Sequence, residues 1–458
     1  MYKINFKKPI HIHFIGIGGI SMSGLAEILH KEGFTVSGSD SRKSPLTNQL
    51  EEKGVRIFYG QSASNIIDGI DCVVYTAAVS RDNPELIEAV ARKIPMLTRA
   101  ELLGQLMKNY STPIAISGTH GKTTTTSMIS HILLEGNLDP TISVGGILQA
   151  IGGNIRVGNS GTFITEACEY TNSFLDFNPK ISVILNIEED HLDFFKDLED
   201  IRHSFHQFAA LLPSDGTLVI NTDIQNYEEI CQGLHCRTVT YGSAPSSDYS
   251  AQNISYDDKG RVSFDLLRKG KQAEHIVLSV TGDHNVSNAL SSIAVGELLD
   301  IPMDIIQKGL ISFSGTDRRF EYKGTLNGTT IVDDYAHHPT EIAATLKAAQ
   351  HYPHNKLWCV FQPHTYTRTK AFFREFAESL SHADHVVLAD IYAARETDTL
   401  GISSKDLSNE IRRTGTDSHY FSSFEKIENF LKKNCKPGDL LITMGAGDVV
   451  NIGEDLLK

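Results

Sequence analysis

Short runs of apolar residues recur along the chain, and most are followed by glycine or polar residues and then by a helical pattern. The run at 10–15 leads through a glycine-rich turn into a predicted helix at 25–30, and the run at 114–117 leads in the same way into one at 127–134. Histidines alternate with apolar residues in the first run, and the second is almost wholly apolar. Short apolar runs of this kind are typical of parallel strands that are buried on both faces. The repeated order of strand and helix predicts an α/β fold built on parallel sheets.

Two breaks divide this pattern into three predicted domains. A Ser-Thr-Pro break at 111–113 follows a predicted connector helix at 100–110, and the segment 313–320 marks the second break. We place the boundaries near residues 105 and 314. The prediction is a Rossmann-like N-terminal domain at 1–105, a central α/β domain of the P-loop ATPase type at 106–314 and a Rossmann-like C-terminal α/β domain at 315–458.

Within the central domain, the hydrophobic period changes to two between residues 251 and 280. Residues 257–260 (Asp-Asp-Lys-Gly) interrupt this alternation with the composition of a hairpin turn. Alternation of apolar and polar residues is typical of strands that are buried on one face only. A small antiparallel flap is therefore predicted on the α/β core, followed by a helix at 286–299.

Composition and charge exclude some classes of protein. The 458 residues are 40% hydrophobic and 21% charged, which is ordinary for a globular protein. The formal net charge is −14 and no strongly basic segment stands out, so nucleic acid is not expected as a partner. No apolar run reaches 18 residues, and no apolar signal-peptide core follows the lysines near the N-terminus, so we expect no membrane association.

The six cysteines are scattered, without the CxxC spacing of a zinc site. They are typical of small buried residues in a reducing environment, so we expect a cytoplasmic protein. The sequence leaves the oligomeric state open between monomer and homodimer.

The clearest chemical motif follows the apolar run at 114–117. A glycine turn leads directly into Lys122 and four threonines, which lead into the predicted helix. Backbone N–H groups at such a helix start face an anion, the lysine reaches the outer phosphates of a nucleoside triphosphate, and the hydroxyl of Thr123 is placed to bind Mg²⁺. The predicted nucleotide-binding residues here are Gly118, Thr119, His120, Gly121, Lys122, Thr123 and Thr124. Ile116 stands where the usual pattern has glycine, so the motif is a shortened variant, and a chance Gly-Lys-Thr turn is the alternative.

A second glycine-rich turn, at 16–24, follows the first predicted strand. Asp40 ends the next strand about twenty residues later, as in dinucleotide-binding domains, although Ser21 replaces the third glycine or alanine. The pattern predicts a diphosphate at the start of a helix and does not identify the nucleotide. A purely structural turn between strand and helix is the alternative.

Two predicted strands of the central domain lead to potential metal ligands. Glu166 ends the strand at 162–166, and His191 lies in the acidic segment 188–193 after the strand at 181–187. Open parallel sheets place their ligands at the carboxyl ends of the strands, and carboxylate and imidazole groups bind divalent cations. Together with the Lys-Thr loop they predict a Mg²⁺ site, and a solvated acidic loop is the alternative.

In the C-terminal domain each polar cluster also comes directly after a predicted strand. The clusters lie at 333–341, 362–368, 390–392 and 444–448. They are expected along the ligand-binding edge of the sheet. A capped helix start is the alternative explanation for His337–Glu341, as a helix cap is for Asn288.

Two anion-binding turns in separate domains suggest that one ligand is ATP and the other a nucleotide-linked substrate. A nicotinamide-dependent dehydrogenase would explain the turn at 16–24, but it would not need Lys122, Thr123 or the pair Glu166 and His191. A non-catalytic nucleotide-binding switch is a further alternative, which would bind ATP without turnover of a carboxylate substrate.

Eight ordered blocks make the chain similar to a known family over essentially its whole length. The chain resembles the Mur ligases, the ATP-dependent ligases of peptidoglycan precursor synthesis. The blocks are GIGGISMSGLA (16–26), GTHGKTTTT (118–126), EACE (166–169), NIEEDHLD (186–193), GDHNVSNA (282–289), GTDRRF (315–320), DDYAHHPTE (333–341) and FQPHTYTRT (361–369).

The resemblance implies a three-step reaction. ATP phosphorylates the carboxylate of UDP-N-acetylmuramate, the amine of L-alanine attacks the acyl phosphate, and phosphate leaves. A carboxylate is a poor electrophile because its leaving group would be oxide, and phosphorylation supplies a stable leaving group. Positioning and charge neutralisation then carry most of the catalysis. A relative that attaches a recycled tripeptide to the same sugar nucleotide, or one that adds a later residue, is the nearest alternative.

The same resemblance implies roles for individual residues. The three domains would bind the UDP-substrate, ATP and the amino acid in turn, with the third closing over ATP. The catalytic residues would be Lys122, Glu166, His191 and Arg368. Thr123 and Glu166 would hold one Mg²⁺ and His191 a second. Further nucleotide contacts would come from Asn285, Asn288, Arg319, Asp334, Tyr335 and His337. The substrate-binding residues would be Gly16, Gly18, Gly19, Ile20, Ser21, Asp40, Thr76, Ala77 and Ser80 for the UDP part, and His364 and Arg368 for the amino acid or the intermediate.

Two stretches depart from the family pattern. Thr365 stands where many relatives have a basic residue, so recognition of the amino-acid carboxylate would depend more on Arg368. Cys168 and Tyr170 stand where other members have Asp and Ser, and the role of Glu169 between them is left open.

Overall fold

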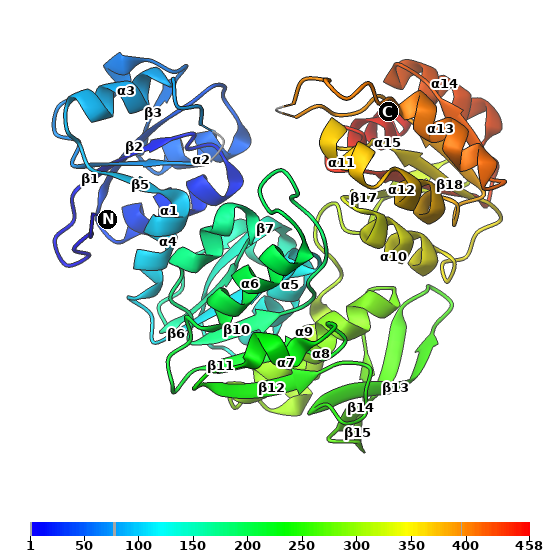
Figure 1. Cartoon of the computed structure of the whole chain (residues 1–458), viewed down its shortest axis with the longest axis horizontal. Helices are drawn as coiled ribbons and strands as arrows, with labels where there is room; N and C mark the ends of the chain where they lie inside the picture. Colours follow the sequence, from blue (N-terminus) through cyan, green and yellow to red (C-terminus); the bar gives the residue numbers. More distant parts are fainter. Residues whose placement is uncertain (1, 77–78, 395) are drawn as a thin grey trace. The chain divides into compact units, whose positions relative to one another are not determined.

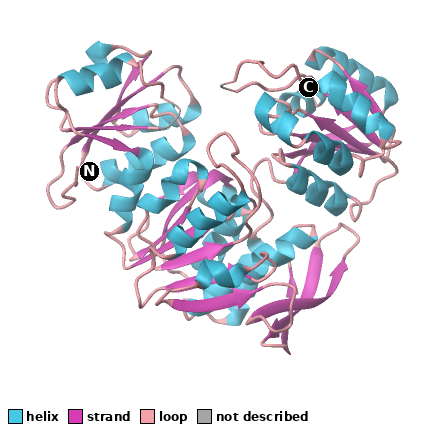
Figure 2. Cartoon of the chain, viewed as in Figure 1, coloured by secondary structure: helices cyan, strands magenta, loops and turns pink. Residues whose placement is uncertain are grey.

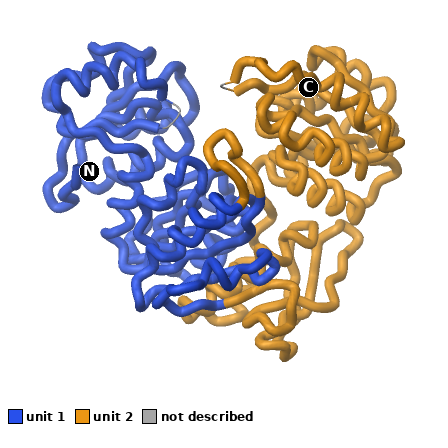
Figure 3. The backbone as a smooth tube through the Cα atoms, viewed as in Figure 1, with its two compact units in different colours: residues 1–188, 199–239 blue, residues 189–198, 240–458 orange. Residues whose placement is uncertain are grey.

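The structure, a computed structural model, describes residues 2–76, 79–394 and 396–458 and contains three sheets with helices on their faces (Figure 1, Figure 2). The chain divides into two compact units, the first made of residues 1–188 and 199–239 and the second of residues 189–198 and 240–458 (Figure 3). The predicted α/β class with three sheet-bearing parts is confirmed. The boundaries near 105 and 314 stay predictions.

The N-terminal sheet lies in the first unit. Its elements are β1 His11–Ile15, α1 Ile20–Lys31, β2 Thr35–Asp40, α2 Pro45–Glu52, β3 Arg56–Tyr59, β4 Cys72–Tyr75, α3 Pro84–Ala91, β5 Met96–Thr98 and α4 Arg99–Met107. The strands are parallel in the order β3-β2-β1-β4-β5. Because the order reverses at β1, the loops after β1 and β4 open at a switch point, where sheets of this kind bind ligands.

The central strands of the first unit form a second sheet. Its elements are β6 Thr112–Ser117, α5 Lys122–Glu135, β7 Thr141–Leu148, β8 Gly153–Arg156, β9 Thr162–Glu166, β10 Ile181–Ile184, α6 Leu198–Ala209, β11 Thr217–Asn221, α7 Tyr227–Cys231 and β12 Arg237–Tyr241. Strand β6 pairs in parallel with both β9 and β10, and Glu166 lies opposite Ile116. The loops after these buried strands therefore lie at one edge of the sheet, as predicted.

The predicted antiparallel flap lies in the second unit, and its strands belong to the same ten-stranded sheet as β6–β12. The elements of this region are β13 Tyr249–Tyr256, β14 Val262–Arg268, β15 Lys271–Val277, α8 Asp283–Leu298 and α9 Met303–Ser312. The three strands pair antiparallel, and Gly260 donates its N–H to the Asp257 carbonyl at 2.9 Å in the predicted turn.

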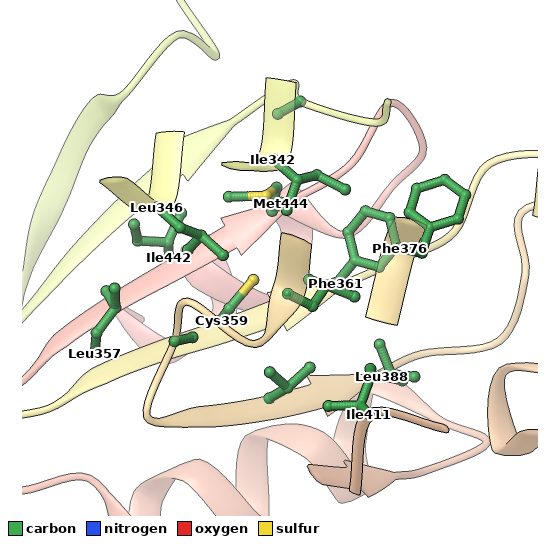
Figure 4. Close-up of a cluster of buried hydrophobic side chains, with 14 of the residues drawn as sticks. Ile342, Leu346, Leu357, Cys359, Phe361, Phe376, Leu388, Ile411, Ile442 and Met444 are labelled. Atoms are coloured by element: carbon green, nitrogen blue, oxygen red, sulfur yellow. The ribbon is translucent and has the colours of Figure 1, made fainter. Parts of the chain in front are cut away.

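The C-terminal sheet completes the second unit. Its elements are β16 Glu321–Leu326, β17 Thr329–Asp334, α10 Pro339–Ala349, β18 Leu357–Phe361, α11 Tyr366–Ala371, α12 Phe373–Leu380, β19 His385–Leu388, α13 Ser404–Arg413, β20 Asp417–Tyr420, α14 Phe424–Asn434, β21 Leu440–Met444 and α15 Val450–Leu456. The order is β16-β17-β21-β18-β19-β20, with only β16 antiparallel. Apolar side chains of the strands and of α10, α12 and α13 form one core of this sheet (Figure 4). The loops after β17, β21 and β18 are neighbours, which brings the predicted polar clusters to one edge.

Three helices begin earlier than the hydrophobic pattern predicts. Helix α1 begins at Ile20, α5 at Lys122 and α8 at Asp283, whereas the regular pattern starts near 25, 127 and 286. Glycine, serine, threonine and asparagine have low helix propensity. Such residues are frequent in these first turns, whose N–H groups lack partners within the helix and remain available for a ligand.

Candidate active site

The phosphate-binding loop, residues 118–121, joins β6 to α5. Gly118 has φ +149° and Gly121, the residue before the helix, has φ +83°, conformations that favour glycine. A Cβ atom at Gly118 would lie 2.9 Å from the Cβ of Leu185, so no larger residue fits. Gly121 supplies no side-chain cap, and the start of α5 is therefore a preformed site for an anion.

Asn186 holds this loop in place. Its Oδ1 accepts the N–H of His120 at 2.7 Å, and its Nδ2 donates to the His120 carbonyl at 3.1 Å. The Thr119 N–H donates to the backbone carbonyl of Asn186 at 3.2 Å, and the Thr119 Oγ1 accepts the Glu188 N–H at 2.9 Å. Sequence reasoning assigned no role to Asn186, although it lies near the end of the predicted strand at 181–187 and opens the NIEEDHLD block.

Lys122 is folded back onto the loop. Its Nζ donates to the carbonyls of Gly118 and Thr119, the latter at 3.1 Å, and forms an ion pair with Glu169 Oε2 at 3.0 Å. Burial lowers the pKa of Lys122, but the nearby charges and hydrogen bond, led by the charge of Glu169, together outweigh burial, so the net shift of the pKa is upward. The lysine therefore stays charged and suited to phosphate.

Two of the three predicted metal ligands lie against neighbouring residues of β7. The Glu166 carboxylate accepts the N–H of Gly145, and a Cβ atom at Gly145 would lie only 2.7 Å from Glu166 Oε2. A Cβ atom at the next residue, Gly146, would lie 3.3 Å from Thr123 Cγ2. Strand β7 thus places a glycine next to each of Thr123 and Glu166. Hydroxyl and carboxylate oxygens fit a hard cation such as Mg²⁺.

The third predicted metal ligand, His191, belongs to the second unit. Its backbone has φ +53°, and its N–H donates to Asp190 Oδ1 at 2.8 Å. Its role as the ligand of a second Mg²⁺ stays a prediction.

The glycine-rich turn of the first sheet is stabilised by Asp40. The Gly18 N–H donates to Asp40 Oδ2 at 2.8 Å, and a Cβ atom at Gly18 would lie 2.8 Å from the same oxygen. Gly16 has φ +81°, and Thr76 approaches it from the loop after β4. Gly19, Ile20 and Ser21 form the start of α1, and Ser80 donates to Asp82. These predicted substrate residues therefore gather at the switch point of the sheet, while Ala77 lies outside the described residues.

Asn285 and Asn288 lie one turn apart at the start of α8, and both are buried. Asn288 Nδ2 donates to Asn285 Oδ1 at 3.1 Å, and Asn285 Nδ2 donates to the Thr281 carbonyl at 2.7 Å. The structure therefore brings this predicted pair together, with fixed amide orientations.

The loop after β17 gathers the predicted C-terminal nucleotide residues. Asp334 accepts the N–H groups of Phe320 and Ala336, both at 2.8 Å. The guanidinium carbon of Arg319 lies 5.3 Å from the centre of the Tyr335 ring. His337 Nδ1 contacts the Tyr335 carbonyl at 3.0 Å, and burial lowers the pKa of His337 to about 3. The histidine is therefore neutral at physiological pH.

Arg368 has partners on two sides. Its Nε and Nη2 donate to Asp190 Oδ1 at 3.2 and 2.9 Å, and its Nη1 lies 3.1 Å from His364 Nδ1. Thr365, the residue that departs from the family pattern, caps α11 by accepting the Arg368 N–H at 3.4 Å. The predicted pair His364 and Arg368 is therefore assembled, and Asp190, to which sequence reasoning assigned no role, joins it.

A half-buried lysine after a glycine loop, with a threonine and a glutamate beside it, is typical of α/β nucleotide-dependent enzymes of the P-loop type. Comparison of the chain with models of protein families identifies its class more precisely. The model described as "Mur ligase family, catalytic domain" matches residues 11–111, "Mur ligase middle domain" matches 116–296, and "Mur ligase, glutamate ligase domain" matches 318–447.

Named proteins of similar sequence and structure belong to the same family. The UDP-N-acetylmuramate–L-alanine ligase of Agathobacter rectalis is 63% identical, with 100% of both chains covered, and that of Lachnospira eligens is 62% identical with the same coverage. A crystal structure of UDP-N-acetylmuramate–alanine ligase from Thermotoga maritima has a TM-score of 0.83 at 28% identity, covering 98% of each chain. A murein peptide ligase from Psychrobacter arcticus has a TM-score of 0.72 at 27% identity, also covering 98% of each. The chain belongs to the Mur ligase family.

Proposed function

We propose that this protein joins L-alanine to the carboxylate of UDP-N-acetylmuramate while ATP is converted to ADP and phosphate. The observation that carries the proposal is the 63% identity, over the whole of both chains, to the ligase of A. rectalis. The loop holding Lys122 supports it, because activation of a carboxylate requires a triphosphate and a cation beside the transferred group.

The proposed chemistry has two bond-forming steps. A carboxylate oxygen attacks the γ-phosphorus of ATP, and the bond from that phosphorus to the bridging oxygen breaks, which releases ADP. The amine of L-alanine then attacks the acyl carbon. The bond from carbon to the phosphate oxygen breaks, phosphate leaves, and the nitrogen loses a proton as the amide forms.

Residues of the central sheet would serve the first step. The ammonium of Lys122 and the N–H groups at the start of α5 would face the phosphates. Thr123 and Glu166 would hold one Mg²⁺ and His191 a second, and bound Mg²⁺ supplies neutralisation of phosphate charge.

Other predicted residues would bind the substrates. The turn at 16–21 with Asp40, Thr76 and Ser80 would hold the UDP part. Asn285, Asn288, Arg319, Asp334, Tyr335 and His337 would contact ATP. His364 and Arg368 would bind the amino acid, because a guanidinium matches the geometry of a carboxylate.

We also propose that the protein works in the cytoplasm, as a monomer or homodimer. All six cysteines are free, which supports a reducing environment. None of the helices in the described ranges combines the length and the hydropathy needed to cross a membrane.

The test is phosphate release from ATP and Mg²⁺ in the presence of UDP-N-acetylmuramate and each of the twenty amino acids, with mass spectrometry of the product. We expect release that requires the sugar nucleotide and is fastest with L-alanine. Lys122→Ala should reduce it by at least about a hundredfold, because the cation beside the transferred phosphoryl group is lost. Lys308→Ala, at a lysine 63% exposed on α9, is the control.

Other outcomes would contradict the proposal. Release with a tripeptide but with no single amino acid would indicate the recycling ligase. No release in any combination would leave a nucleotide-binding protein without ligase activity.

A further inference from the structure

Glu169, whose role the sequence leaves open, is a buried acid three residues after Glu166. Its exposed fraction is 2%, although a carboxylate is costly to bury without a partner. Both carboxylate oxygens face Lys122 Nζ, at 3.0 and 3.4 Å. The charge of this acid is therefore directed at the lysine of the phosphate-binding loop.

The turn that carries Glu169 is strained and firmly held. Thr171 and Asn172 have φ +56° and +57°, a left-handed conformation that is uncommon for residues other than glycine and unfavourable for a β-branched residue. The Asn172 N–H donates to the Glu169 carbonyl at 2.9 Å, and Ser204 of α6 donates to the Asn172 side chain. Ser173 Oγ contacts the carbonyls of Cys168 at 2.9 Å and Tyr170 at 3.0 Å. These contacts fix the carboxylate of Glu169 in position.

All three protons of the Lys122 ammonium can be assigned to acceptors in the described part of the chain. Two acceptors are the carbonyls of Gly118 and Thr119, and the third is Glu169. A phosphate that binds at the loop must therefore share the ammonium with these groups. Glu169 is the only charged competitor among them.

We propose that Glu169 is a positioning residue that holds Lys122 where the transferred phosphoryl group passes, at the expense of affinity for ATP. The inference rests on the proposed function, in which Lys122 stabilises phosphoryl transfer. The carboxylate of Glu169 weakens the attraction between the Lys122 ammonium and bound ATP. The same carboxylate also fixes the position of the ammonium, which aligns the ammonium with the transition state. The two effects have opposite signs and can be separated by measurement.

The experiment compares Glu169→Gln with the wild type by kcat, by KM for ATP and by calorimetric binding of ATP. Glutamine keeps the size of the side chain but removes its charge. We expect kcat to fall at least about tenfold, since small displacements of a catalytic group have effects of this size or larger. We expect ATP to bind as tightly as to the wild type or more tightly. Glu169→Asp retains the charge on a shorter side chain and should recover part of kcat.

The control is Glu199→Gln, the same change at a side chain 81% exposed on α6. The inference is wrong if kcat of Glu169→Gln stays within about twofold of the wild type, or if ATP binds tenfold more weakly. If glutamine prevents folding, judged by thermal melting, Glu169→Asp is assessed by the same criteria. Absence of turnover in the wild type would contradict the proposed function instead, and the ATP-binding comparison would still test Glu169.

Discussion

Arg368 makes contacts that a lysine cannot reproduce. Two of its nitrogens donate to Asp190 and a third lies beside His364, which fixes the plane of the guanidinium. We predict that Arg368→Lys raises the KM for L-alanine at least about tenfold, because a lysine offers no planar fork to a carboxylate. The KM for ATP should change much less.

Steady-state kinetics with L-alanine and ATP varied in turn measures this difference. Arg374→Lys, at an exposed arginine on α12, is the matched control. An unchanged KM for L-alanine would remove Arg368 from the proposed amino-acid site.

Asp334 gives a prediction for the dependence of stability on pH. Burial raises its pKa from the ordinary 3.8 to about 6, although Arg319 and two N–H groups act in the opposite direction. Between these pH values the folded state binds more protons at Asp334 than the unfolded state does. Protonated Asp334 therefore contributes its full stabilisation of the fold below pH 3.8. This stabilisation, on the order of 2–3 kcal/mol, is lost as the pH rises through about 6.

The asparagine of Asp334→Asn cannot ionise, so this variant should not lose stability at this position as the pH rises. The melting temperature of the variant, relative to the wild type, should therefore rise between pH 4 and pH 7. His337 acts in the opposite sense, because its pKa is lowered to about 3, but it is present in both proteins and cancels from the comparison. A difference in melting temperature that is constant with pH would contradict the assignment.

At the scale of elements, strand β7 controls the space around Glu166. A Cβ atom at Gly145 would lie 2.7 and 2.9 Å from the two carboxylate oxygens of Glu166, so an alanine must displace them. We predict that Gly145→Ala raises the Mg²⁺ concentration needed for half-maximal phosphate release by about tenfold or more, as loss of support around a metal ligand commonly does.

Titration of activity with Mg²⁺, together with direct binding of Mn²⁺, measures this effect. Gly153→Ala on the adjacent strand β8 is the control, because a Cβ atom there would meet nothing within 4 Å. If both variants needed the same Mg²⁺ concentration as the wild type, Glu166 would not be a metal ligand.

At the scale of the whole molecule, the proposed ATP contacts are divided between the two compact units. The phosphate-binding loop belongs to the first unit, while Asn285, Asp334 and His337 belong to the second. If all of them contact one ATP, binding should draw the units together.

We predict that a non-hydrolysable ATP analogue together with UDP-N-acetylmuramate lowers the radius of gyration measured by small-angle X-ray scattering. Lys122→Ala should reduce this change by weakening contact with the phosphates. A radius that does not respond to the ligands would contradict the proposed closure.

The sequence by itself determined the features that depend on local order. Apolar runs predicted the buried strands, and glycine, lysine or acid after each run predicted the loops at the carboxyl ends of those strands. Because parallel strands place these ends at a common edge, the positions of Lys122, Glu166 and Asp334 along the chain were enough to predict sites at the edges of their sheets. The family followed from the same blocks and is confirmed.

Only the tertiary structure decided which distant residues meet. Asp190 and Arg368 are 178 positions apart, and Lys122 and Glu169 are 47 apart, so no local pattern pairs them. Hydrophobic periodicity sets the face of a strand or helix, but strand order and the packing of loops set the partners of a polar side chain. For this reason the motifs that contain Asn186, Glu169 and Asp190 could be recognised in the sequence. The contacts of these three residues could not be predicted, because they depend on the fold.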